Sequence, residues 1–162
     1  MMLKLENIAT FGQFIEAAAQ TYKNRTAIKI RPRFRAVSLS YCDLFKYSVF
    51  VAQLLEKAGI RKGDKVLLWA PNSHLWVASF FGIQLKGAVA VPINVQSTKG
   101  FIRKIVEQTE AKLIIKSSRL PAIKGIETIQ IEDVPLLSSL SEFNLEFKKP
   151  KINNDDVAEI IY

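Results

Sequence analysis

The sequence predicts an α/β domain with a mainly parallel sheet and helices on both faces of that sheet. Apolar runs at residues 66–70, 88–91 and 112–115 are typical of short buried strands, because turn or polar residues flank each of them. Segments with helical periodicity separate these runs, and strands that alternate with helices usually pair in parallel through right-handed crossovers. The 162 residues are enough to bury one core of their own.

The N-terminal part begins with two helix signals. Thr10 opens a capping box, which predicts a helix over 11–22 with one buried stripe. Ser40, followed three residues later by an acidic residue, predicts a second amphipathic helix over 41–58. Phe50 falls among polar residues on the outer side of this second helix, so we expect it to be exposed.

Between these helices lies a predicted hairpin with a basic face. Residues 27–31 and 36–39 predict two short strands around a turn that contains Pro32. Alternate positions along the hairpin are basic, and they are Lys29, Arg31, Arg33 and Arg35. Side chains two apart share one face of an extended segment, and we interpret this face as solvated. A weak peripheral membrane contact through the hairpin Lys29 to Arg35 stays open as an alternative.

The central segment, residues 59–94, is a complete strand, helix and strand unit. Asn72 or Ser73 is positioned to cap a helix over 74–86, and Gly87 is positioned as its left-handed C-terminal cap. Apolar residues surround this helix on every side, which indicates burial on all sides. One sheet can cover only one side, so a second layer must cover the other.

The C-terminal half repeats the pattern and then weakens. Thr98 is expected to cap a helix that leads to the strand at 112–115. The expected inner side of this helix carries Phe101, Ile102, Ile105, Val106 and Thr109. Further on we expect a strand at 127–131, an apolar patch at 136–137 and a polar surface connection at 148–151.

Composition limits the classes of function. The single cysteine, Cys42, precludes an intrachain disulfide and a cysteine-based metal cluster, and it fits a reducing compartment. No apolar run reaches the roughly 18 residues of a membrane-spanning helix, and the N-terminus lacks a signal-peptide pattern. We therefore expect a cytoplasmic protein. The net charge of +8 invites a nucleic-acid partner, but the basic residues are spread and lack interleaved stacking aromatics, so we expect none.

Candidate chemical groups are few, and each has a plainer structural explanation. They are His74, Cys42, the pair Asp155 and Asp156, and the cap positions Asn72 and Thr98. The histidine has no acidic partner or second histidine at a ligand spacing, and the cysteine sits in the first turn of a helix. The acidic pair reads as a polar loop before an apolar segment. Neither a dinucleotide fingerprint nor a phosphate loop occurs. We expect no catalytic, cofactor-binding or metal-binding residue in this chain.

Four motifs carry a family resemblance. In order they occupy residues 39–44, 63–66, 71–73 and 87–94. Together they resemble the N-terminal part of the AMP-forming acyl-CoA synthetases and related adenylate-forming enzymes, and the resemblance extends from Phe11 to Tyr162. Residues 156–162 look like the strand that in this family leads into a Thr/Ser/Gly-rich phosphate-binding loop.

The resemblance implies a division of the chain and an activity for a longer parent enzyme. Residues 1–150 would form the N-terminal α/β subdomain, and residues 151–162 would begin the next one, truncated before the phosphate-binding loop. The parent would activate a carboxylic acid with ATP and Mg²⁺ as an acyl-adenylate and then transfer the acyl group to coenzyme A. The run 94–98 resembles fatty acyl-CoA synthetases more than amino-acid-activating relatives.

For the fragment itself, the resemblance implies scaffold and one wall of the acyl pocket. Every catalytic residue of the family would lie beyond Tyr162, so we expect the fragment alone to be inactive and to bind none of these cofactors. We also expect it to self-associate, since it would lack the remainder of the parent chain. Two alternatives stay open: a stand-alone binding or dimerisation module, and another adenylate-forming activity, such as amino-acid activation or acyl loading of a carrier protein.

Overall fold

A computed structural model describes every residue except 1–2, 4–5, 7, 32–35 and 136–145. The helices are α1 (Phe11–Tyr22), α2 (Tyr41–Lys57), α3 (His74–Leu85), α4 (Lys99–Thr109) and the 3₁₀ turn η1 (Ile131–Asp133). The strands are β1 (Thr26–Ile30), β2 (Val37–Ser40), β3 (Lys65–Trp69), β4 (Val89–Pro92), β5 (Leu113–Lys116) and β6 (Glu127–Gln130). Apart from the strand expected at 156–162, each predicted helix and strand within the described residues is present, with ends shifted by one or two residues.

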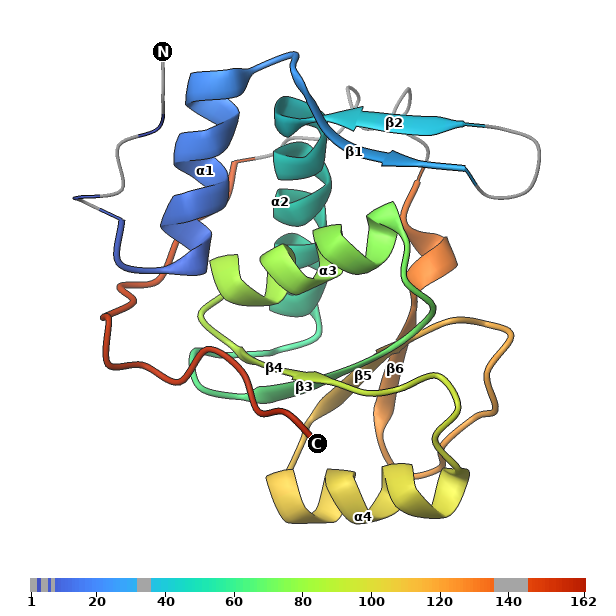
Figure 1. Ribbon diagram of the computed structural model, residues 1–162. Helices are drawn as coiled ribbons and strands as arrows, with labels where there is room; N and C mark the ends of the chain where they lie inside the picture. Colours follow the sequence, from blue (N-terminus) through green and yellow to red (C-terminus); the bar gives the residue numbers. More distant parts are fainter. Residues whose placement is uncertain (1–2, 4–5, 7, 32–35, 136–145) are drawn as a thin grey trace.

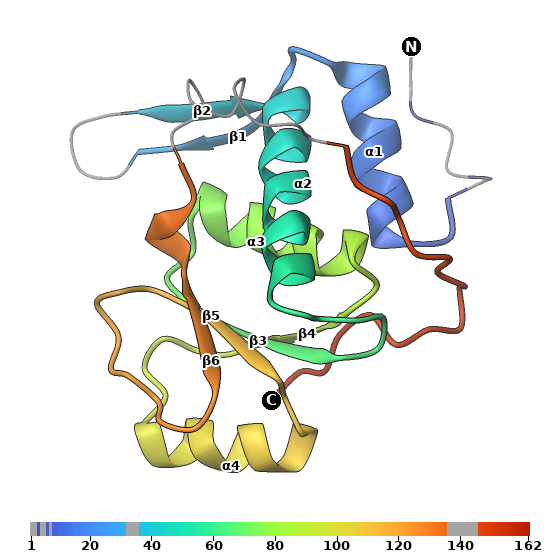
Figure 2. The same cartoon turned by 180° about the vertical axis from the view of Figure 1, so that it is seen from behind.

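The elements form layers around a four-stranded parallel sheet of order β4-β3-β5-β6. Helix α4 covers one face of the sheet, and α3 lies between the other face and the pair α1 and α2 (Figures 1 and 2). The strands β1 and β2 form a separate antiparallel ribbon beside α2. The predicted fold class, a parallel sheet with helices on both faces, is confirmed.

Alternation along the strands divides the core into two clusters. On β3 and β5, Val66, Leu68, Leu113 and Ile115 pack with α2 and α3, whereas Leu67, Trp69 and Ile114 pack with α4. All of these side chains are at most 1% exposed. Continuous apolar runs are what a parallel sheet covered on both faces requires, because successive residues point to opposite faces.

The layer between the sheet and the outer helices explains the composition of α3. Ser73, rather than Asn72, caps it: the Ser73 Oγ accepts a hydrogen bond from the Trp76 backbone N–H at 3.1 Å. Gly87 follows the helix with φ +68°, which confirms the predicted left-handed cap. The second layer expected from the apolar pattern is the pair α1 and α2.

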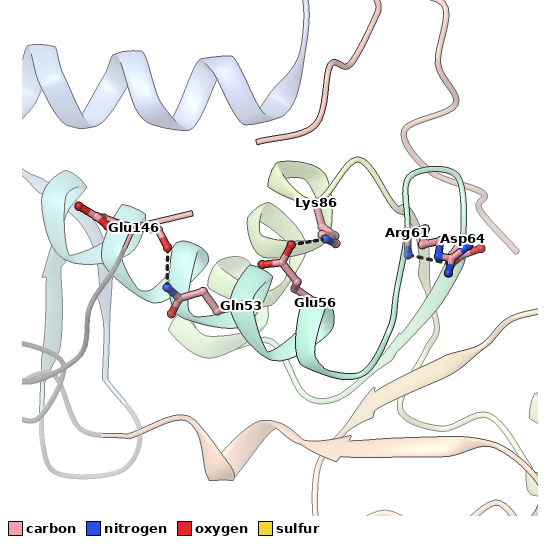
Figure 3. Close-up of polar contacts among 6 residues, drawn as sticks. All are labelled: Gln53, Glu56, Arg61, Asp64, Lys86 and Glu146. Atoms are coloured by element: carbon pink, nitrogen blue, oxygen red, sulfur yellow. Dashed lines mark hydrogen bonds and ion pairs between the residues drawn. The ribbon is translucent and has the colours of Figure 1, made fainter. Parts of the chain in front are cut away.

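Helix α2 differs from the prediction, because Phe50 is only 8% exposed and belongs to the core. The segment after Glu146 returns along α2, where the Gln53 Nε2 donates to the Glu146 carbonyl at 3.0 Å (Figure 3). Phe147 packs against the same cluster. Lys86, which directly follows α3, lies over the Phe147 ring and forms an ion pair with Glu56. A helical wheel of α2 cannot show contacts with residues ninety positions away, so its outer side looked free.

Helix α4 also differs in one residue, because Phe101 is 44% exposed. The buried stripe of α4 consists of Ile102, Ile105 and Thr109. Phe101 lies at the margin of this stripe, on the first turn, and its side chain faces solvent.

The strand expected at 156–162 is reduced to a single parallel bridge between Ala90 and Glu159. Ala90 donates to the Ala158 carbonyl and accepts from the Ile160 N–H, at 3.0 and 2.9 Å. The next donor toward this segment on β4 would be residue 92, which is a proline without an N–H. The ladder therefore cannot continue along that edge.

The basic hairpin is described only in part. Lys29 and Arg31 are exposed, as expected of a solvated face. The turn residue Pro32, the basic residues Arg33 and Arg35, and the apolar patch at 136–137 lie outside the described residues. No helix in the described part of the chain is both long and apolar enough to cross a membrane.

Candidate functional site at the carboxyl edge of the sheet

The strand order reverses at β3, because β4 lies on one side of β3 and the next strand along the chain, β5, lies on the other side. Helix α3 connects β3 to β4 across one face, and α4 then connects β4 to β5 across the other face, on the far side of β3. In open α/β sheets, ligands bind outside the carboxyl ends of the strands where the order reverses in this way. The carboxyl edge of the sheet on either side of β3 is therefore the place to look for a site.

A cavity of about 390 Å³ opens there, and we call it the carboxyl-edge pocket. Its lining residues are Ala70, Pro71, Asn72, Trp76, Pro92, Ile93, Asn94 and Val95. They come from the loop after β3, the first turn of α3, the last residue of β4 and the loop that follows it. The Trp76 ring is stacked on Phe80, with centroids 5.9 Å apart and an interplanar angle of 3°, which fixes its orientation.

The polar groups around this pocket are neutral and largely paired. The Asn94 Oδ1 accepts from the Gln96 N–H at 2.9 Å, and the Asn94 carbonyl accepts from the Trp69 Nε1 at 3.1 Å. Thr98 caps α4 by accepting from the Phe101 N–H at 3.3 Å, so this expected cap is confirmed. None of the described residues that line the pocket carries a charged side chain. It suits an apolar or uncharged group.

Charged groups do gather at the neighbouring ends of β5 and β6, where the sequence analysis singled out none. Lys116 is 5% exposed, and its Nζ donates to the Ser117 and Leu120 carbonyls at 2.7 and 2.8 Å. Glu132 accepts from the Ser117 Oγ at 2.5 Å and from the Ser118 N–H at 2.8 Å. Burial raises the pKa of Glu132, but these hydrogen bonds outweigh it and leave the pKa below its usual range. Both groups are engaged in holding the loop after β5.

His74 opens α3 close to the pocket but offers no catalytic arrangement. Its ring lies edge-on to Tyr47, with centroids 6.3 Å apart, and its buried Nδ1 has no hydrogen-bond partner among the described residues. Burial lowers the pKa of His74 from its ordinary value, which favours the neutral form of the ring. The expected structural role of His74 fits this environment.

The other groups considered from the sequence lie apart from the carboxyl edge. The half-buried Cys42 directs its Sγ to the Ala19 carbonyl at 3.6 Å. Asp156 accepts from the Asn153 N–H at 2.7 Å and pairs with Lys62 at 2.5 Å, while Asp155 is exposed. The hydrogen bond from Lys62, with that from Asn153, lowers the pKa of Asp156. These contacts are those of a polar turn.

The carboxyl-edge pocket by itself does not fit a nucleoside triphosphate. Phosphate oxygens need clustered backbone donors, Lys or Arg, and the lining supplies none of these cations. Within the described ranges, no group of three or more His, Cys, Asp or Glu residues could hold a metal ion.

Comparisons with known proteins place these features in a family. The sequence profile of the family described as "AMP-binding enzyme" matches residues 15–162. The chain is 32% identical over 137 residues to 4-coumarate–CoA ligase 1 from Petroselinum crispum, a match that covers 77% of this chain and 25% of that protein. It is 28% identical over 170 aligned positions to crotonobetaine/carnitine–CoA ligase from Escherichia coli O127:H6, covering 93% of this chain and 33% of that protein.

Solved structures agree with the fold. The fatty acyl-adenylate ligase from L. pneumophila, solved with acyl adenylate and pyrophosphate, superposes with a TM-score of 0.83 over 98% of this chain and 29% of that chain. Its sequence identity of 20% supports the fold alone. The chain thus spans about a quarter to a third of the length of these three relatives.

Proposed function

The chain belongs to the AMP-binding enzyme family, and from this premise we propose that it is the N-terminal part of an ATP-dependent ligase that activates a carboxylic acid. The carboxylate would attack the α-phosphate of ATP, which forms an acyl-adenylate and releases pyrophosphate. The thiol of coenzyme A would then attack the acyl carbon and displace AMP. Mg²⁺ would screen the phosphate charge.

One observation carries the assignment of a role to this part of the enzyme. The bridge at Ala90 and Glu159 runs parallel to β4, so the segment that ends at Tyr162 points toward the same edge as the carboxyl-edge pocket. Ile93 lies three residues after Ala90 and lines the pocket, and Tyr162 lies three residues after Glu159. A phosphate-binding loop that followed Tyr162 would therefore begin beside the pocket.

The neutral lining suggests which part of the substrate the pocket would hold. Trp76, Pro71 and Pro92 offer apolar surface, and the described lining includes no cation. This suits the body of the acid rather than its phosphate-bearing end. We therefore propose that the pocket is one wall of the acyl site. The acid is either an aromatic acid, which the relationship to a 4-coumarate–CoA ligase supports, or a fatty acid, which the run at 94–98 favoured.

The remaining assignments follow from this proposal. Residues 1–150 would be one subdomain and residues 151–162 the start of the next, with the rest of the parent chain as the principal partner. The cytoplasm is the proposed location, since a single cysteine suits a reducing compartment. A stand-alone binding module is the second candidate, and the buried core that this chain forms without other residues favours it.

The test uses the complete reading frame that encodes these residues. We expect the frame to continue into a Gly/Ser/Thr-rich loop, and its product to catalyse acid-dependent exchange of pyrophosphate into ATP. Trp76→Ala should raise KM for the acid with a smaller effect on kcat, whereas Trp76→Phe should retain most of the activity. A native stop codon after Tyr162 would favour the stand-alone module. An active enzyme whose KM for the acid does not change in Trp76→Ala would refute only the proposal that the carboxyl-edge pocket is one wall of the acyl site.

A further inference from the structure

A second cavity lies at the opposite edge of the sheet. It encloses about 520 Å³ at the amino end of β4, and we call it the amino-edge pocket. Its walls are the segment 8–14 at the start of α1, the last two turns of α3 with residues 87–88, and the segment 152–158. Figure 1 shows these three parts of the chain meeting beside the lower end of α1. This volume is within the range of roughly 300–1,000 Å³ typical of small-molecule sites.

Aromatic rings form the apolar wall of this pocket. Phe80 contacts Phe11 and Phe81 edge to face, with centroid distances of 5.6 and 5.7 Å, and Phe14 stacks on Phe81 at 6.3 Å. All four rings line the cavity, and Phe11 remains 43% exposed. Rings presented in both orientations favour a flat aromatic guest, which can pack edge to face against one ring and offset against another.

The charges near the pocket are already neutralised. Asp156 is the one ionisable side chain among the described lining residues, and Lys62 pairs with it at 2.5 Å. Burying an ion here would leave it without a counter-charge, so the pocket selects against charged ligands. One buried polar group is available: Gln84 is 6% exposed, and its Nε2 donates to the Ala158 carbonyl, which leaves the amide oxygen as an acceptor.

The wall formed by residues 152–158 is anchored at several points. Gln84 holds Ala158 at 2.8 Å, Ala90 holds the same carbonyl at 3.0 Å, and Lys149 forms an ion pair with Glu16 of α1. These anchors join the C-terminal segment to α1, α3 and β4. The cavity is therefore formed before a ligand arrives, which reduces the entropic cost of binding.

We propose that the amino-edge pocket binds a neutral, planar aromatic small molecule with one hydrogen-bond donor, which pairs with the Gln84 amide oxygen. The site lies at the amino end of β4, whereas the carboxyl-edge pocket lies beyond its other end. It is thus separate from the site of the proposed ligase chemistry and does not depend on it.

The probe is carbazole, a neutral, planar and fluorescent aromatic compound with one N–H donor. Titrated into the 162-residue chain at low micromolar concentration, it should bind saturably with one molecule per chain. Val157→Asp places a carboxylate on the rim, where the native side chain is 61% exposed, and should weaken binding about tenfold or more. Phe101→Asp is the matched control: it changes an exposed residue of α4 and should leave the affinity unchanged.

Three results would overturn the proposal. Binding that does not saturate would indicate adsorption of the probe to exposed surface. Equal affinity of the Val157→Asp variant and the unsubstituted 162-residue chain would mean that the probe binds outside this pocket. An affinity that falls as the chain concentration rises would make a second copy the occupant. Urea unfolding verifies that the variants fold, and Phe11→Ser, a second change at the rim, replaces Val157→Asp if that variant is unfolded.

Discussion

Gly82 is the residue on which the close contact between α2 and α3 depends. A Cβ at this position would lie 2.6 Å from the Val51 Cβ and 2.9 Å from the Ser48 carbonyl oxygen, distances that packed atoms do not tolerate. Gly82→Ala should lower the free energy of unfolding by about 1–3 kcal/mol, although alanine favours helices. The measurement is the urea midpoint.

The matched control for this change is Gly100→Ala on α4, where an added Cβ meets nothing within 4 Å. This substitution should leave stability unchanged or raise it by up to about 1 kcal/mol. Equal midpoints for Gly82→Ala and Gly100→Ala would show that α2 and α3 can move apart without loss.

His74 gives stability a dependence on pH above the range of the carboxylates. Burial lowers its pKa in the folded chain, so the unfolded chain takes up the proton first as the pH falls below about 6.5. Stability is therefore full above that value and declines until the folded pKa is reached. The pKa values of Asp64, Glu132 and Asp156 are also lowered, and their stabilisation is lost only at more acidic pH.

The measurement is the urea midpoint at several pH values between about 7.5 and 5. His74→Gln has no titrating ring, so its urea midpoint should vary less with pH across this interval than that of the unsubstituted chain. Parallel profiles would place the titration on another group.

Single residues also show where sequence reasoning stops. A helix cap at Asn72 or Ser73 and the left-handed Gly87 were predictable, because each depends on neighbours within a few positions. The burial of Phe50 and the requirement for Gly82 were not. Both depend on contacts between segments that are distant in the sequence, which local periodicity does not encode.

At the scale of elements, strands and helices were predictable because their cores are continuous. The runs at β3, β4 and β5 are buried on both faces, so a simple apolar stretch identified each strand. The final segment, residues 156–162, was predicted as a strand from the family resemblance. It forms one bridge because Pro92 removes the next donor, a fact about its partner rather than about its own sequence.

Gln84 anchors this final segment to α3. Gln84→Met keeps the length of the side chain but removes the donor to the Ala158 carbonyl, at a cost of about 1 kcal/mol. The Ile160 amide, which donates to Ala90, should then exchange with deuterium about fivefold faster through local opening. Gln108→Met, on the exposed side of α4, is the control and should leave this amide unchanged. Unchanged exchange in Gln84→Met would mean that the bridge to β4 holds the segment alone.

At the scale of the whole molecule, the candidate site was only half predictable. The sequence indicated the family and the strand, helix and strand unit that forms one wall. It did not indicate the cavity between Trp76 and Val95, because that cavity arises only when the carboxyl ends of β3 and β4 are brought together.

The charges around the carboxyl-edge pocket predict whether the 162-residue chain binds a nucleotide. The described residues that line the carboxyl-edge pocket include no Lys or Arg, and the ammonium of the nearby Lys116 donates to two carbonyls. We expect calorimetric titration of the 162-residue chain with Mg-ATP to give no heat of a tight site, because a triphosphate requires clustered donors. A micromolar dissociation constant would require a site that these residues do not show.

The last prediction concerns the outer edge of the sheet, beyond the bridge at Glu159. Ile161 is 77% exposed and Tyr162 is 52% exposed, and they follow a segment whose second edge has no strand beside it among the described residues. Unpaired strand edges with apolar side chains tend to pair with another chain. We expect the 162-residue chain to dimerise or aggregate at tens of micromolar, measured by light scattering behind size-exclusion chromatography. Ile161→Lys should shift it toward monomer, because charge on an edge opposes pairing, whereas Phe101→Lys should not. If the unsubstituted 162-residue chain were strictly monomeric, this edge would be protected by its own short length and by Pro92. That result would favour the stand-alone module over a subdomain that needs the rest of a longer enzyme.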